Sequence, residues 1–254
     1  MSCGLDTYYY LDAPFSDGHT TYASTDDPTS FYFSCVTNET SSTGDNYKYF
    51  DTSSDFVFLG TEIYYKIYNN YNTMISAESS ISSLITSSSS YSSAAENIID
   101  TRGYKTLKIS TGTFSPLIKN GDSPKNRYIY IRLNDLATDS TGTYGAAICV
   151  GNDSENIILK SYSAASALKY NGTIVKPRRY INSSYGFNFS SKDSSNPVPS
   201  SSDADITYSS SSTESGVWYI DMYAISVGRD SSYTLSYSKP LLLGSVKISQ
   251  SDYE

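Results

Sequence analysis

Histidine and carboxylate side chains are the residues whose types could support acid–base chemistry in this chain. The one histidine, His19, follows Gly18 in a polar segment, and the G-x-S-x-G turn that presents a hydrolase nucleophile is absent. Glu62 and Asp221 are the carboxylates best suited to a glycosidase-type acid–base pair, because each occurs in a long alternating segment. The alternative is that both carboxylates are ordinary charges on the solvent-facing side of a strand, which would give the same alternating pattern. The sequence therefore predicts no catalytic residue and no enzymatic activity.

Acidic turns and cysteines are the groups that could ligate a metal ion. None of the acidic turns matches the calcium-binding loop D-x-[DN]-x-[DN]-G-x₅-E, and Asp is common in turns for conformational reasons. The turns concerned contain Asp122, Asp135 with Asp139, Asp153 with Glu155, and Asp203 with Asp205. Cys3, Cys35 and Cys149 are too far apart for a C-x-x-C site. We expect no metal and no cofactor, with Cys35 and Cys149 either buried thiols or a disulfide.

Tyrosine is the most distinctive residue type, with 26 copies in 254 residues. Three segments (62–68, 128–133 and 218–224) alternate between an apolar face and a tyrosine-bearing face, which is typical of half-buried strands. We predict that the tyrosine-bearing faces bind a protein or a glycan, since an exposed tyrosine offers a flat ring with a polar tip. The predicted binding residues are Tyr64, Tyr68, Tyr128, Tyr130, Tyr219 and Tyr223. Cross-strand packing, or burial beneath a helical segment, is the alternative role for them.

The elements that must position these tyrosines are antiparallel strands. Many short alternating segments separated by polar turns predict a mainly β protein. We predict two antiparallel β-sandwich domains, at residues 5–118 and 119–254, because the Pro- and Gly-containing segment 115–126 is the best boundary. Apolar residues at helical spacing predict a short helical insertion, residues 73–100, in the first domain, with Asn72 or Thr73 as its cap.

Composition limits the partners of the chain. The net charge is −8, and the nearest basic cluster, Lys176–Arg179, is short and isolated, so we expect no nucleic-acid partner. Only 17% of residues are charged, and solubility depends on Ser, Thr, Asn and Gly. There is no apolar run of about 20 residues that would predict a transmembrane helix. This profile favours an extracytoplasmic β-rich protein.

Three stretches carry a resemblance. Ser2-Cys3-Gly4-Leu5, running into TYYYLDAP, resembles the mature amino terminus of spirochaete-type bacterial surface lipoproteins. FLGTEIYYKIYNN is similar to a central strand of fibronectin type III-like or immunoglobulin-like sandwiches, and GVWYIDMYAISVGRDSSYTLSYS has the texture of such lipoproteins. The resemblance implies that Cys3 carries acyl chains such as palmitate and that residues 1–4 form a tether. It further implies a membrane-anchored position at the cell surface or in the periplasm.

These observations lead to one main functional hypothesis with two alternatives. The main hypothesis is a non-enzymatic, lipid-anchored extracytoplasmic protein with a structural, adhesive or ligand-binding role. The first alternative is a carbohydrate-binding module, or a viral tail or fibre component, that uses the tyrosine-rich faces. The second is a secreted hydrolase built on Glu62 and Asp221.

Overall fold

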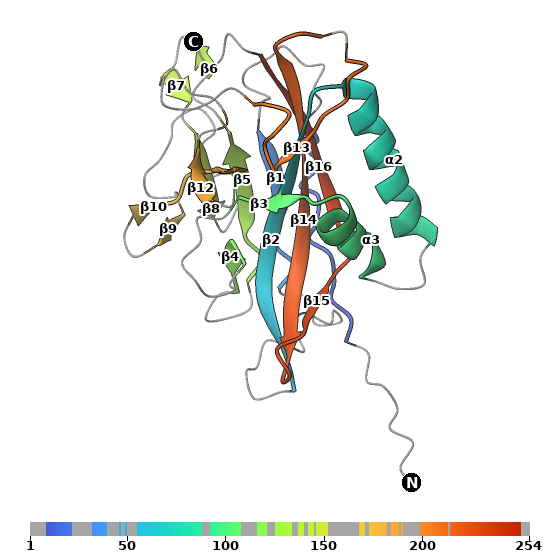
Figure 1. Ribbon diagram of the computed structural model, residues 1–254. Coiled ribbons are helices and arrows are strands. Elements are labelled where there is room, and N and C mark those ends of the chain that lie inside the picture. The colour runs from blue at the N-terminus through green and yellow to red at the C-terminus, as the bar shows by residue number, and fades with distance from the viewer. Residues whose placement is uncertain are drawn as a thin grey trace.

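Two long antiparallel strands form the centre of the molecule. The computed structural model describes residues 9–21, 32–39, 46, 49, 55–87, 92–107, 116–120, 125–133, 137–139, 142–144, 146–151, 168–170, 173–181, 184–187, 189, 199–212 and 214–249. Strand β2 (Phe56–Tyr68) pairs with β14 (Val217–Asp230) along most of their lengths (Figure 1). Their alternating β-branched and aromatic residues suit a pleated, two-sided packing environment.

Short strands complete a seven-stranded sheet around this pair. β4 (Ile118–Lys119), β3 (Lys105–Thr106) and β13 (Ile206–Thr207) line the free edge of β2 in turn. β15 (Leu235–Tyr237) and β16 (Leu241–Ser249) line the free edge of β14. All of these pairings are antiparallel except that of β13, which runs parallel to β2.

A second, three-stranded sheet has the order β1 (Phe33–Val36), β5 (Tyr128–Arg132), β8 (Ala147–Gly151), all antiparallel. Three separate two-stranded ladders complete the described strands. They are β6 (Ala137–Asp139) with β7 (Gly142–Tyr144), β9 (Lys169–Tyr170) with β10 (Thr173–Ile174), and β11 (Arg179–Ile181) with β12 (Ser184–Phe187).

The main core lies between the two large sheets. The apolar faces predicted for the three alternating segments all point into it, so that part of the prediction is confirmed. Its members from those segments are Ile63, Tyr65, Ile67, Ile129, Ile131, Leu133, Trp218, Ile220, Met222 and Ala224. Phe33, Cys35 and Ile148 contribute from β1 and β8. Burial of this much apolar surface is the main force that holds the sheets together.

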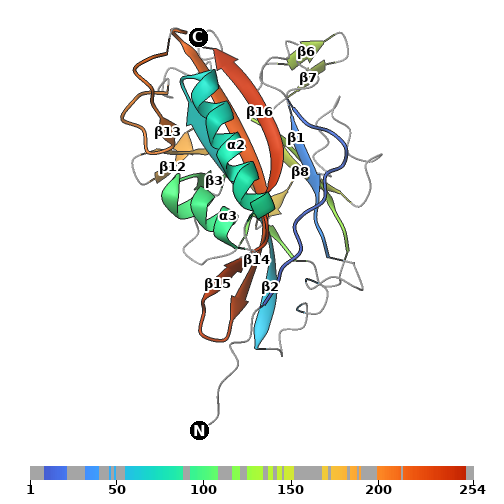
Figure 2. The ribbon, with the colours of Figure 1, turned by 90° about the vertical axis from the view of Figure 1, so that its right-hand side faces the viewer.

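Helices cover the opposite face of the seven-stranded sheet (Figure 2). They are α2 (Tyr71–Ser87), α3 (Ser93–Glu96) and a π-helical turn (Asn97–Thr101), which confirms the expected helical segment. The predicted cap residues are wrong, because the Asn70 side chain accepts the hydrogen bond from the Thr73 backbone N–H, at 3.0 Å. Met74, Ala77 and Ile81 are the buried residues of α2. A second core therefore lies between sheet and helices.

The division into two sandwiches at residue 118 is not what the described strands form. β1 and β2 precede that position, yet β1 pairs with β5 and β2 pairs with β14, which both follow it. The mainly β fold is confirmed, but each of the two large sheets contains strands from both halves of the chain, before and after residue 118. Alternation along a strand shows which face is buried, whereas it does not show which strand lies alongside. The Pro- and Gly-containing segment 115–126 was therefore not sufficient evidence for a domain boundary.

Gly60 allows β4 to approach β2 closely. It has φ +138°, and a Cβ atom there would lie 2.1 Å from the backbone oxygen of Ile118. The register with β14 shifts at this point, since Val227 pairs with Gly60 and Gly228 with Phe58. Leu59 is therefore the extra residue of a β-bulge.

Candidate functional site

Four of the six predicted binding tyrosines are buried beneath the helices. Tyr64, Tyr68, Tyr219 and Tyr223 are each at most 5% exposed and belong to the core between α2, α3 and the seven-stranded sheet. Their expected exposure to solvent is therefore wrong. The helical segment that follows β2 folds back over its tyrosine-bearing face, so these rings pack against helices and are not available to a ligand.

A buried carboxyl group lies among these tyrosines. Asp221 is fully buried and accepts a 2.6 Å hydrogen bond from the Tyr104 hydroxyl, which in turn is 2.9 Å from the Tyr68 hydroxyl. Burial raises the pKa of Asp221 well above its ordinary value. Lys66, its cross-strand neighbour on β2, donates to the Gly103 carbonyl oxygen, and burial lowers its pKa. Hydrogen bonding and packing thus tie the helices to the sheet.

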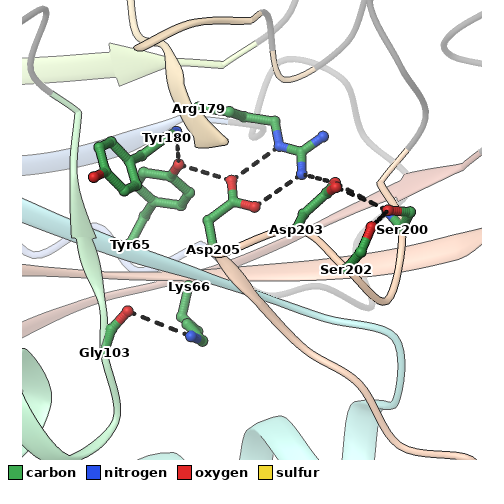
Figure 3. Close-up of polar contacts among 9 residues, drawn as sticks. All are labelled: Tyr65, Lys66, Gly103, Arg179, Tyr180, Ser200, Ser202, Asp203 and Asp205. Carbon is green, nitrogen blue, oxygen red and sulfur yellow. Dashed lines mark hydrogen bonds and ion pairs between the residues drawn. The ribbon is translucent and has the colours of Figure 1, made fainter. Parts of the chain in front are cut away.

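A buried arginine joins two acidic residues on the other side of the sheet (Figure 3). Arg179 Nε and Nη2 donate to the two Asp205 carboxylate oxygens at 3.0 and 2.9 Å, and Nη2 also donates to Asp203 at 2.7 Å. The Tyr65 hydroxyl donates to Asp205 at 2.8 Å and accepts from the Tyr180 backbone N–H at 2.6 Å. A two-point guanidinium–carboxylate contact of this kind fixes geometry as well as charge.

This arginine cluster explains two sequence patterns in structural terms. The Asp203–Asp205 turn, considered above for calcium, directs both carboxylates to Arg179. Arg179 is the last residue of the basic cluster, and its side chain is buried. Ser200 further fixes the turn through its backbone N–H and hydroxyl, which donate to Asp203 at 3.0 and 2.8 Å. The three charged residues that the sequence suggested for calcium or nucleic-acid binding are thus paired with one another inside the fold.

The residues considered for hydrolysis are not assembled into a catalytic pair. Glu62 and Asp221 are both buried, so the expectation of solvated charges is wrong. Asp221 pairs with Lys66, four residues along β2 from Glu62, so the backbone positions of the two acidic residues lie about 13 Å apart along the sheet. Glycosidase carboxylates lie about 5–9.5 Å apart. His19 Nε2 lies 2.9 Å from the Thr21 hydroxyl and 3.1 Å from the Tyr32 carbonyl oxygen, which is not the environment of a Ser–His–Asp triad.

The remaining two predicted tyrosines, Tyr128 and Tyr130, lie at a pocket on the three-stranded sheet. Tyr128 is partly exposed, whereas Tyr130 is buried with only 9% exposure, so the expected solvent exposure of Tyr130 is also wrong. Phe15 exchanges backbone hydrogen bonds with Val36 of β1, at 2.8 and 2.9 Å, and Val36 pairs with Tyr128 of β5. Side chains at paired positions share a face, so Phe15, Val36 and Tyr128 form one row, and Tyr130 follows two residues along. This face is opposite the one that packs into the main core through Ile129.

The pocket has a volume of about 500 Å³ and an aromatic lining. Its described lining residues are Phe15, Ser16, Asp17, Val36, Asn126, Tyr128 and Tyr130. Phe15 is 42% exposed. The volume lies within the range of small-molecule sites, and the lining is more polar than that of most such sites, because Ser16, Asp17 and Asn126 lie beside the three aromatic rings. The lining could therefore stack against a flat apolar ligand face while hydrogen-bonding its polar groups.

Stacked aromatic rings behind the pocket and the negative charge of Asp17 determine the electrostatics of the pocket tyrosines. Tyr32 stacks on His19 with ring centroids 3.9 Å apart and contacts Tyr130 at 5.6 Å. Burial, followed by the negative charge of Asp17, raises the pKa of Tyr130 to about 12. The same two causes raise the pKa of Tyr32, although the positive charge of Arg132 opposes them. The tyrosine hydroxyls therefore remain neutral hydrogen-bonding groups at physiological pH.

The cysteines are separated by the sheet. Cys35 pairs with Ile129 and faces the core, whereas Cys149 pairs with Tyr130, one residue out of phase, and faces the other side. No disulfide joins them, so the disulfide alternative is wrong. Burial raises the pKa of Cys35 far above its usual range. Cys3, the predicted lipidation site, lies outside the described residues.

Sequence reasoning missed Phe15, Asp17 and Asn126 as pocket residues. Each lies in a polar connecting segment, and they come together only because the chain around Phe15 pairs with β1 and β1 pairs with β5. A lone aromatic residue, Phe15, followed by Asp17-Gly18 within a polar loop was the available signal. Such a signal gives no information about the long-range pairing.

Comparisons with known proteins give no match to a protein-family model, a curated protein or a solved structure. Within the described residues, no helix is both long and apolar enough to cross a membrane. The same residues contain no group of three or more His, Cys, Asp or Glu side chains placed to hold a metal ion.

Proposed function

We propose that this protein is a non-enzymatic, extracytoplasmic ligand-binding protein whose aromatic pocket binds a saccharide. The observation that carries the proposal is the pocket lined by Phe15, Tyr128 and Tyr130 beside Asp17 and Asn126. A sugar ring has apolar C–H faces that stack on aromatic rings, and hydroxyl groups that donate to carboxylate and amide oxygens. Both kinds of contact are available on this lining.

The rigid support of the pocket favours binding by a preformed site. Tyr128 and Tyr130 lie on the central strand of a three-stranded sheet whose opposite face is packed into the main core. The Thr37 hydroxyl accepts from the Arg127 backbone N–H at 2.9 Å, and Asn126 Oδ1 accepts from the Glu39 N–H at 2.8 Å. A site held in this way loses little conformational entropy when a ligand binds.

A glycan array followed by calorimetry tests the proposal. We expect wild-type protein to bind at least one glycan, and Tyr128→Ala to weaken that binding about tenfold or more, as loss of one stacking ring typically does. Tyr208→Ala is the matched control, since Tyr208 is 58% exposed and lies outside the pocket lining. An array without hits, or equal losses in both variants, would argue against saccharide binding at this pocket.

Anchoring through Cys3 is a separate part of the proposal and rests on the amino-terminal sequence alone. Two or more acyl chains on that cysteine would hold the protein stably at a membrane, where one chain gives only marginal binding. Intact-mass measurement of protein purified from the native membrane fraction tests this part. An amino-terminal peptide without added acyl mass would remove the membrane as a partner and leave the pocket proposal unaffected.

A further inference from the structure

The charge of the pocket constrains its ligand beyond the general class of saccharides. Among the seven described lining residues, Asp17 is the only charged one, and none is Lys or Arg. Arg132 lies on the same sheet face but two residues beyond Tyr130, outside the lining. An anionic ligand would therefore meet a negative charge with no basic lining residue to offset it. A cation would be attracted by Asp17.

The aromatic rings add to this preference. The face of a tyrosine or phenylalanine ring is electron-rich and attracts an ammonium group placed over it. Phe15, Tyr128 and Tyr130 line the same pocket as Asp17, so a cation there would meet rings and carboxylate together. The negative charge of Asp17 acts on Tyr130, since it is one cause of the raised pKa of the Tyr130 hydroxyl.

Asp17 is held in a conformation that leaves part of its carboxylate for a ligand. Its Oδ1 accepts the His19 backbone N–H at 3.1 Å, which is the hydrogen bond of an Asx turn. Its Oδ2 accepts no hydrogen bond from the described residues. The turn fixes the side chain beside the pocket, and the second oxygen is the group that can pair with a cation.

We infer that the pocket selects saccharides that carry a protonated amino group, with the ammonium paired to Asp17 and the sugar ring stacked on Tyr128, which is the partly exposed tyrosine of the lining. This inference rests on the proposed saccharide binding and adds the charge of the ligand to it. Neutral N-acetylated sugars of the same skeleton retain the stacking surface but lack the charge. Acidic sugars are disfavoured by Asp17.

Calorimetric titration with two matched oligosaccharides tests the inference. One is a β-linked glucosamine dimer at mildly acidic pH, where its amines are protonated, and the other is the same dimer fully N-acetylated. We expect wild-type protein to bind the amine form about tenfold or more tightly, as a charge-assisted hydrogen bond supplies. The difference should shrink as salt is added, because exposed charges are screened.

Asp17→Asn is the decisive variant, since Asn keeps the acceptor for the His19 N–H and removes only the charge. We expect it to bind both dimers with equal affinity, while Asp55→Asn, an exposed carboxylate outside the lining, keeps the wild-type preference. Equal binding of both dimers by wild-type protein, or a preference that survives in Asp17→Asn, would overturn the inference and leave saccharide binding standing. If neither dimer binds and the glycan array is also empty, the proposed function itself fails.

Discussion

Replacing Asp221 by Asn should stabilise the protein, and the gain should grow with pH. The carboxyl group is fully buried, and its second oxygen, Oδ1, accepts no hydrogen bond within the described part of the chain. Burial raises its folded-state pKa, and the negative charge of Glu78 adds to the rise. The hydrogen bonds from the Tyr104 hydroxyl and from the Asp221 backbone N–H, followed by the positive charge of Arg102, oppose it. Asn has the same shape, keeps an acceptor for Tyr104 and is never charged.

The direction in which stability changes with pH follows from proton linkage. Because the folded-state pKa of Asp221 lies above the unfolded value near 3.8, the folded protein retains a proton that the unfolded chain releases between these two values. Stability from this group is complete below the unfolded pKa and falls as pH rises through the window up to the folded pKa. The slope is at most about 1.4 kcal/mol per pH unit, so the advantage of Asp221→Asn grows by at most about 4.4 kcal/mol between the unfolded pKa and pH 7.

Urea unfolding from about pH 4 to pH 8 measures this effect. The single tryptophan, Trp218, is 8% exposed in the main core, so its fluorescence reports loss of that core. Contributions of other titrating groups cancel in the difference between variant and wild type. Asp100→Asn, at an exposed position in the π-helical turn, is the control and should show a small difference at every pH. A flat difference for Asp221→Asn, or one that falls with rising pH, would refute the reasoning.

Two further substitutions test the backbone and the buried ion pairs, both measured by urea unfolding. Gly60→Ala should lower the free energy of unfolding by at least about 1 kcal/mol, because the new Cβ would meet the backbone of the neighbouring strand. Gly18→Ala is the control and should lower it less, since Gly18 has φ +89° but no atom within 4 Å of the new Cβ. Equal losses of stability in the two variants would contradict the steric argument. Arg179→Met should cost about 3–5 kcal/mol, because it leaves two carboxylates without their buried partner. Arg178→Met, on the partly exposed neighbouring residue, should change stability by less than about 0.5 kcal/mol, and a similar effect of both changes would show that the ion pairs contribute little.

The sequence allowed the faces of individual strands to be predicted, whereas it did not reveal their partners. The inward positions of Ile63, Ile131 and Ile220 follow from a period of two and the need to bury apolar surface. The pairing of β2 with β14 joins distant parts of the chain, and neither strand contains a signal that selects the other.

The candidate site was only partly predictable for the same reason. Tyr128 and Tyr64 have equivalent patterns in the sequence, yet one lines a pocket and the other lies under a helix. Local spacing indicates that a side chain leaves the main core. What covers it afterwards depends on tertiary packing, here the position of α2.

The central pairing of β2 with β14 has a consequence for synthesis of the chain. Ile67 lies opposite Ile220, so β2 gains its longest partner only when most of the polypeptide has left the ribosome. Until then a long strand with an open edge is exposed in the nascent chain, and such edges are prone to pair with other chains. Contacts of this sequence separation also slow folding. We therefore expect aggregation during expression to increase with the time between the synthesis of β2 and the synthesis of β14. Chaperone binding near β2 during that time should improve the yield of folded protein.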